Sequence, residues 1–197
     1  MTGIINYGAG NIFSLTAALN RLNIPYGMIN IPEELEKYER YIIPGVGHAG
    51  AAMQKLRNSG LAESIPTLRK PVLGICVGMQ LLTDFSEEGN SRLTGIVPLN
   101  TLHFNKEHGL KVPHTGWNQV DLDKQNLLFD GLGAQQYFYF VHSFFIEFNP
   151  KFTIASAEYG IKFSAVIQKD NYYGVQFHPE KSGVAGEKIL SNFSLLA

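Results

Sequence analysis

Three side chains in this sequence could together do covalent chemistry. Cys76, the only cysteine, lies between two glycines in the stretch GICVG, and His178 follows an apolar run and precedes Glu180 by two residues. A thiolate used for acyl transfer needs a general base, and that base needs an orienting group. Pro179 fixes the backbone between the histidine and the glutamate, so that the carboxylate can reach back toward the ring. The three residues therefore predict a Cys-His-Glu triad.

The cysteine is predicted to stand on a sharp turn between a strand at 72–75 and a helix at 77–84. The spacing matches the G-x-S-x-G nucleophile elbow with sulfur in place of the hydroxyl oxygen, and glycines let neighbouring backbone come close. The start of the following helix would favour the thiolate. Taken alone, a cysteine in apolar surroundings is more often a small buried side chain, but its combination with His178 favours a nucleophile.

Attack on a carbonyl also requires donors for the developing negative oxygen. The stretch Pro44-Gly45-Val46-Gly47 follows an apolar run at 41–43, and its glycines would let backbone N–H groups turn toward a substrate. We interpret it as a candidate oxyanion loop. An ordinary strand-to-helix turn would look the same in isolation.

These motifs must be positioned by an α/β fold. The first half alternates short apolar runs with segments of helical period, which is typical of βα units around a parallel sheet. Strands are expected at 3–6, 26–29, 41–43 and 72–75, with helices at 11–22, 33–38, 51–57 and 77–84. Later segments favour an antiparallel or mixed extension, with strands at 95–97, 101–104, 117–120, 137–145, 153–157, 165–168 and 172–177 and a last helix at 185–196. We expect a single domain over residues 1–197.

The composition excludes several classes of function. The chain has 197 residues, 45% of them hydrophobic, and 16 basic residues nearly balance 17 acidic ones. No large positive field is available for nucleic acid or for an anionic membrane surface, and no apolar run is long enough to span a membrane. With one cysteine and no secretory signal, we expect a cytoplasmic protein, and we expect neither a metal nor a cofactor.

Three motifs, PGVG, GICVGMQLL and GVQFHPE, occur in this order, and together they make the chain similar to class I glutamine amidotransferases. The resemblance implies a flavodoxin-like three-layer fold with a central, mostly parallel sheet flanked by helices. It also implies hydrolysis of L-glutamine to glutamate and ammonia through a cysteine thioester.

The same resemblance implies a role for individual residues. Cys76 would attack the glutamine amide, His178 would move protons, and Glu180 would orient the imidazole. Backbone N–H groups of Val46 or Gly47, with that of Val77, would hold the oxyanion. The residues implied in glutamine binding, the last three mainly through backbone atoms, are Gly78, Gln80, His142, Ser143 and Phe144.

Further stretches, at 5–11, 112–118, 139–143 and 174–183, resemble one branch of the family, the glutaminase subunits of histidine biosynthesis. That branch implies a heterodimer with a (β/α)8-barrel cyclase, which would receive the ammonia. Residues expected at the docking face are Asn11, Trp117, Asn118 and Lys181.

Three alternatives stay open at this point: a related subunit that feeds another synthase, for example in surface-sugar modification; a redox sensor without activity; and a stand-alone hydrolase of γ-glutamyl compounds. The His-Glu pair argues against the sensor, since a sensor needs only the thiolate. The stretches HTGWN and EKSG would have no purpose in the stand-alone hydrolase.

Overall fold

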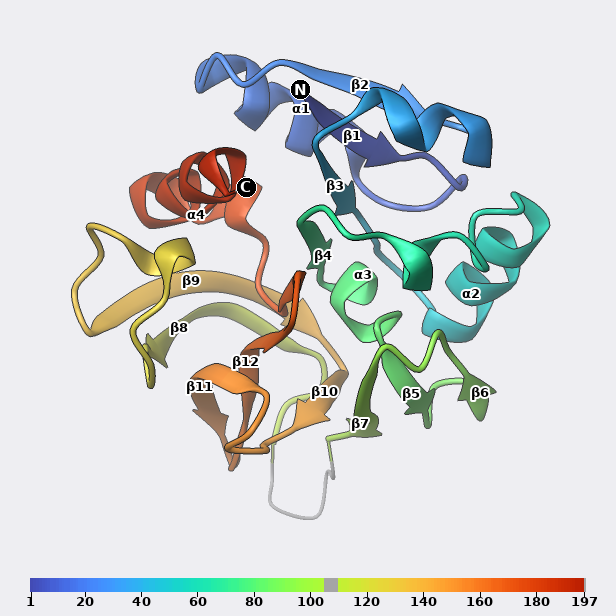
Figure 1. Ribbon diagram of the computed structural model, residues 1–197. Coiled ribbons are helices and arrows are strands. Elements are labelled where there is room, and N and C mark those ends of the chain that lie inside the picture. The colour runs from blue at the N-terminus through green and yellow to red at the C-terminus, as the bar shows by residue number, and fades with distance from the viewer. Residues whose placement is uncertain (105–109, 197) are drawn as a thin grey trace.

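The computed structural model describes residues 1–104 and 110–196, and one 13-stranded sheet runs through the described part of the chain (Figure 1). Its first half is parallel, in the order β2-β1-β3-β4-β13. These strands are β1 (Thr2–Ile5), β2 (Tyr26–Ile29), β3 (Arg40–Ile43), β4 (Val72–Ile75) and β13 (Tyr172–Val175). Every residue of β1 and β4 is buried, as expected of parallel strands covered on both faces.

The second half of the sheet is mainly antiparallel and continues as β12-β10-β7-β5-β6. These strands are β12 (Ile161–Lys169), β10 (Phe144–Glu147), β7 (Val97–His103), β5 (Thr83–Ser86) and β6 (Ser91–Arg92), and only the β5–β7 pair is parallel. A branch leaves β12 through β11 (Thr153–Tyr159) to the long hairpin of β8 (His114–Asp121) and β9 (Gln135–His142). The expected change from parallel to mixed pairing is confirmed.

Helices cover the parallel half on both sides. In Figure 1, α4 (Gly183–Leu195) and α2 (Ala49–Asn58) lie on opposite sides of β4, while α1 (Ile12–Arg21) contacts the 3-10 turn η5 (Pro179–Lys181). The helix α3 (Val77–Gln80) directly follows β4. The other 3-10 segments among the described residues are η1 (Pro32–Lys37), η2 (Ile65–Thr67) and η4 (Leu127–Phe129). The layered α/β fold expected from the sequence is thus present.

Two sequence expectations about elements near the cysteine are wrong. The helix expected at 77–84 ends at Gln80, because residues 83–86 join the sheet as β5 beside β7. The strand expected at 137–145 is broken at Ser143, because β9 pairs with β8 whereas β10 pairs with β7 and β12. The break at Ser143 and the turn after β5 place Ser143 and Glu88 in the pocket that contains Cys76.

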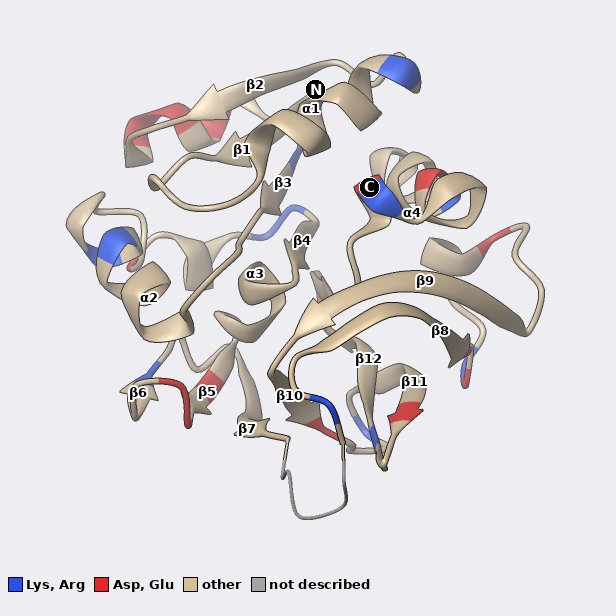
Figure 2. Ribbon diagram, turned by 180° about the vertical axis from the view of Figure 1, so that it is seen from behind, with Lys and Arg blue, Asp and Glu red and all other residues tan. Residues whose placement is uncertain are grey.

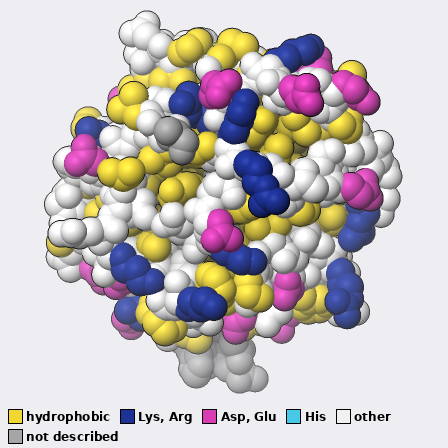
Figure 3. Space-filling model, viewed as in Figure 1, with side chains coloured by type: hydrophobic (Ala, Val, Ile, Leu, Met, Phe, Trp, Pro, Cys, Tyr) yellow, Lys and Arg dark blue, Asp and Glu magenta, His cyan; other side chains and the backbone are white. Residues whose placement is uncertain are grey.

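Charged side chains of both signs are scattered over the ribbon in Figure 2, and on the face in Figure 3 they are interspersed with apolar side chains. This distribution agrees with the balanced composition. Within residues 1–104 and 110–196, each helix is too short or too polar to traverse a bilayer.

Candidate active site

Cys76 sits at a tight turn between the end of β4 and the start of α3. Its φ of 53° and ψ of −112° put a non-glycine residue in a sparsely populated backbone region, as in a nucleophile elbow. The flanking glycines are needed for space: a Cβ on Gly78 would lie 1.8 Å from the carbonyl oxygen of Ile43, and one on Gly74 would lie 2.4 Å from that of Gly78. The turn therefore depends on both glycines.

The loop 44–47 lies directly against this elbow. A Cβ on Gly45 would come within 2.5 Å of the Gly78 backbone nitrogen, and Gly47 has a φ of 85°. The buried hydroxyl of Tyr7 donates a 2.7 Å hydrogen bond to the carbonyl oxygen of Pro44 and so anchors the start of the loop. Val46 and Gly47 both line the pocket beside Cys76. As the first residue of α3, Val77 has an N–H group without an intrahelical acceptor.

His178 and Glu180 form a buried pair. Their side chains are 2% and 3% exposed, and His178 Nδ1 lies 2.8 Å from Glu180 Oε1. The backbone of His178 is also fixed, since its N–H group donates to the Tyr139 carbonyl and its carbonyl oxygen accepts from the Ser182 hydroxyl. Because a carboxylate accepts hydrogen bonds, Nδ1 of His178 carries a proton and donates it to Glu180.

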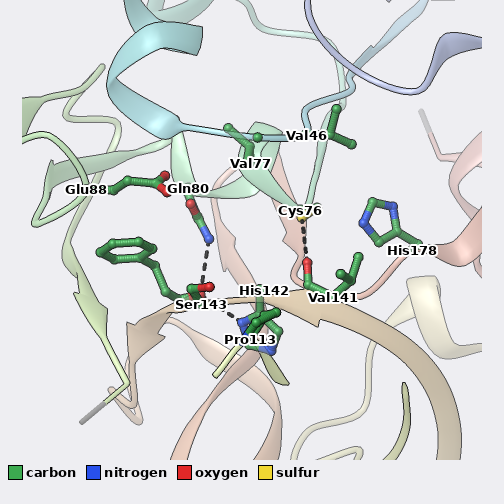
Figure 4. A pocket seen from close by; sticks show the side chains of 12 residues that line it. Val46, Cys76, Val77, Gln80, Glu88, Pro113, Val141, His142, Ser143 and His178 are labelled. Carbon is green, nitrogen blue, oxygen red and sulfur yellow. Dashed lines mark hydrogen bonds between the residues drawn. The ribbon is translucent and has the colours of Figure 1, made fainter. Parts of the chain in front are cut away.

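The other ring nitrogen of His178 is available to Cys76. Figure 4 shows the two side chains beside each other at one end of the pocket, and His178 Nε2 is buried without a hydrogen bond that meets ordinary geometry. Burial lowers the pKa of His178, but interaction with Cys76 and with Glu180 outweighs it and raises that pKa to about 10. At neutral pH the ring is therefore an imidazolium next to the sulfur, which favours the thiolate.

A pocket of about 330 Å³ opens beside the cysteine. Figure 4 shows His178 and Glu88 at opposite ends of it, with Gln80 between them. The residues lining it are Val46, Gly47, Cys76, Val77, Gln80, Glu88, Pro113, Val141, His142, Ser143, Phe144 and His178. Of the five residues implied in glutamine binding, four line this pocket and the fifth, Gly78, lies beneath it in α3.

Gln80 is 2% exposed and is oriented by its neighbours. Its Nε2 lies 3.3 Å from the Phe144 carbonyl oxygen and 3.2 Å from Gln176 Oε1. Its own Oε1 is buried without a partner. Since a buried acceptor without a donor is costly, this oxygen is suited to receive a hydrogen bond from a bound molecule.

Both ring nitrogens of His142 are engaged by protein groups. Its Nδ1 lies 2.8 Å from the Phe144 carbonyl oxygen and its Nε2 lies 2.9 Å from Nδ1 of His114. Burial lowers the pKa of His142 to about 3 and that of His114 to about 4, so both rings are neutral at pH 7. A carbonyl can only accept, so His142 carries its proton on Nδ1 and His114 donates to its Nε2.

Sequence reasoning missed two residues of this site. Glu88 lies in the turn after β5, and its carboxylate lines the pocket while also accepting from the Ala49 backbone N–H. Gln176 is fully buried behind the cysteine, with Nε2 3.8 Å from Cys76 Sγ. Gln176 stood inside the GVQFHPE motif, whereas nothing in the local sequence marks Glu88.

The four residues expected at a docking face do not all share one surface. Trp117 is 57% exposed on the outer face of the β8–β9 hairpin, opposite Tyr139, and Lys181 Nζ lies 5.9 Å from the centre of the Tyr139 ring. Asn118 points to the other face, because neighbouring residues in a strand alternate, and its amide donates to the Glu158 carbonyl. Asn11 caps α1 by accepting from the Ser14 N–H.

The chain belongs to the class I glutamine amidotransferases: the family model "Glutamine amidotransferase class-I" matches residues 3–197. Among curated proteins it is 46% identical over 191 residues to "Imidazole glycerol phosphate synthase subunit HisH" of Bacteroides fragilis, covering 96% of both chains. It is also 46% identical over 190 residues to the protein of the same name from Pasteurella multocida, covering 96% and 95% of the two chains.

Solved structures agree on the fold at much lower identity. A structure titled "Crystal structure of glutamine amidotransferase" superposes with a TM-score of 0.75 at 17% identity, covering 98% of this chain and 96% of the other. The structure of PurLQS from Thermotoga maritima gives a TM-score of 0.73 at 17% identity, covering 98% and 96%. The family model and the curated relatives confirm the family resemblance drawn from the motifs, and the solved structures confirm the fold.

Proposed function

We propose that this protein is the glutaminase subunit of an imidazole glycerol phosphate synthase and hydrolyses L-glutamine through Cys76, His178 and Glu180. The observation that carries the proposal is the buried His178–Glu180 pair beside an elbow cysteine, at one end of a pocket of about 330 Å³. The similarity to subunits of that name over 96% of the chain supports the choice of synthase.

The reaction follows from the charges of the site. The Cys76 thiolate adds to the side-chain carbonyl carbon of glutamine, and the resulting oxyanion is held by N–H groups of Val46 or Gly47 and of Val77. The His178 imidazolium gives its proton to the departing nitrogen, so that ammonia leaves and a thioester remains. The neutral His178 then takes a proton from water, hydroxide attacks the thioester, and glutamate departs as the thiolate is restored.

Glu88 would determine which way round glutamine lies in the pocket. The carboxylate lies at the end of the pocket away from His178, where it would pair with the α-ammonium group of glutamine. The unpaired oxygen of Gln80 and backbone groups of Ser143 and Phe144 would then hold the rest of the amino acid. Such a pocket would orient the side-chain amide toward the sulfur.

The ammonia requires a partner, because at neutral pH free ammonia becomes ammonium, which is not a nucleophile. We propose a heterodimer with a (β/α)8-barrel cyclase subunit, whose products would be imidazole glycerol phosphate and the carboxamide ribonucleotide of purine synthesis. Exposed Trp117, with Tyr139 and Lys181 beside it, supports a docking surface on the β8–β9 hairpin. We also propose that residues 1–197 act as one domain, which the family match over 3–197 supports.

The first experiment measures glutamate and ammonia released from glutamine. Cys76→Ala and His178→Ala should abolish release, and Glu180→Gln should reduce it strongly, whereas Glu63→Gln, at an exposed glutamate, should match the unmodified protein. Full activity in Cys76→Ala would overturn the proposed mechanism.

The second experiment identifies the receiving synthase. The chain is mixed with a purified histidine-pathway cyclase and its nucleotide substrate, and glutamine turnover is compared with that of the isolated chain. We expect turnover to rise and glutamine to replace added ammonium as the nitrogen source for the cyclase. Glutamine hydrolysis that neither responds to the cyclase nor supplies it would favour a related subunit serving another synthase.

A further inference from the structure

Gln176 is a buried polar side chain that the reaction described above leaves without a role. It is fully buried one strand away from the elbow, two residues before His178, and its carboxamide lies between Gln80 and Cys76. Nε2 of Gln176 is 3.8 Å from the cysteine sulfur, and Oε1 is 3.2 Å from Gln80 Nε2. The side chain therefore touches both the nucleophile and a residue of the glutamine pocket.

The hydrogen-bond network fixes which end of each amide faces which neighbour. The Phe144 carbonyl oxygen can only accept, so the Gln80 atom 3.3 Å away must be the NH₂ group. The second hydrogen of that NH₂ group meets Gln176, whose facing atom must then be its oxygen. The NH₂ group of Gln176 is consequently turned toward the sulfur of Cys76.

The neutral histidine pair shares the acceptor at which this chain starts. His142 Nδ1 donates to the same Phe144 carbonyl oxygen, and His114 donates to His142 Nε2. With two donors on it, this carbonyl leaves no alternative orientation for Gln80, since a reversed amide would set two oxygens against each other. Two donors thus meet at the Phe144 carbonyl oxygen, and from Gln80 onward the donors run toward Cys76, from Gln80 to Gln176 and from Gln176 to the sulfur.

We propose that Gln176 is a further catalytic residue: its carboxamide donates a hydrogen bond to Cys76 Sγ, favours the thiolate and ties the sulfur to Gln80. A donor that faces the charged form of a group stabilises that form, and a bond to a charged acceptor is stronger than one to a neutral thiol. The same chain leaves Gln80 Oε1 buried without a partner in a residue that lines the pocket, so the proposed substrate acceptor and the nucleophile are held by one set of bonds. This inference rests on the proposed role of Cys76 as the nucleophile.

The test uses the rate of alkylation of the full-length protein by iodoacetamide as a function of pH. Cys76 is the only cysteine, so the titration reports on it alone. Gln176→Met keeps a side chain of similar length but has no donor, and we expect the midpoint of the titration to move up by roughly one pH unit, a tenfold loss of rate below the midpoint. Gln176→Glu keeps the shape and turns an acceptor toward the sulfur, so the midpoint should rise at least as far.

The matched control is Gln168→Met, because the amide of Gln168 bonds the Tyr173 hydroxyl and the Asp170 carbonyl, away from the pocket. It should keep the midpoint of the unmodified protein. A midpoint that is unchanged in both Gln176→Met and Gln176→Glu would overturn the inference, as would an equal shift in Gln168→Met. Loss of the proposed function itself would be seen separately, as glutamine turnover that survives in Cys76→Ala.

Discussion

Acidification should destabilise this protein through His114 and His142, in a pH range above that in which most carboxylates titrate. Burial holds the pKa of His142 at about 3 and that of His114 at about 4, whereas a histidine in the unfolded chain titrates near 6.5. At pH values between the folded and the unfolded pKa, the two histidines are protonated in the unfolded chain but neutral in the folded protein. The stability contributed by the two neutral rings is therefore complete above pH 6.5 and is lost as the pH falls toward 4 and 3.

The expected size follows from linkage. One histidine with such a lowered pKa costs about 2 kcal/mol between pH 7 and pH 5. Both rings are buried, but His114 stacks against half-buried Tyr159, so we count His142 in full and take about half of that figure for His114. His178 has the opposite effect, because its pKa is raised to about 10: between pH 7 and pH 5 it adds about 1 kcal/mol to the free energy of unfolding. The net loss is about 2 kcal/mol.

The assay is urea unfolding followed by circular dichroism at pH 7, 6 and 5. His48→Gln changes an exposed histidine and should leave the decline as it is. The double variant His114→Phe, His142→Leu removes both buried rings and should abolish the decline. Equal stability of the unmodified protein at pH 7 and pH 5, or a decline that persists in the double variant, would refute the reasoning.

Three substitutions test other parts of the account. Glu88→Gln keeps an acceptor for the Ala49 N–H but removes the charge, so KM for glutamine should rise roughly tenfold with little change in kcat, while Glu87→Gln, whose carboxylate bonds the His103 N–H instead, should not change KM. Gly78→Ala puts a methyl group 1.8 Å from the Ile43 carbonyl oxygen and should lower the free energy of unfolding by about 3 kcal/mol or more. Gly133→Ala, whose added methyl group has its nearest neighbour 3.4 Å away, should change it little. Trp117→Ala should leave the melting temperature nearly unchanged but weaken binding of the cyclase in calorimetry by roughly tenfold or more, whereas Leu127→Ala, at an exposed residue of η4, should bind normally.

The fold could be predicted where local pattern and final packing agree. β4 is an apolar run buried on both faces, and its bounds match the expected 72–75. The pattern failed where a strand is defined by a distant partner: β5 is a short, half-exposed segment that exists because it pairs with β7, and β9 and β10 form one apolar run that changes partners at Ser143. Such pairing cannot be deduced from hydrophobic period alone.

The site could be predicted where a motif carries its chemistry in a few adjacent residues. The elbow around Cys76 and the pair of His178 and Glu180 are motifs of this kind. The folded chain places Cys76 and His178 at one end of one pocket, with Glu180 bonded to His178. Glu88 and Gln176 could not be identified from the sequence, because their place in the site depends on contacts that form only on folding: Glu88 with the pocket, and Gln176 with the Cys76 sulfur. Asn118 shows the reverse case, since the alternation of β8 turns it away from the surface that Trp117 occupies.

The most direct test of the central claim is to detect the covalent intermediate. The protein is mixed with saturating glutamine, quenched in acid, digested and analysed by mass spectrometry. We predict a γ-glutamyl thioester on the peptide that contains Cys76, and no adduct in Cys76→Ala. Release of glutamate with Cys76 unmodified at every quench time, or an adduct on any other residue, would contradict the account.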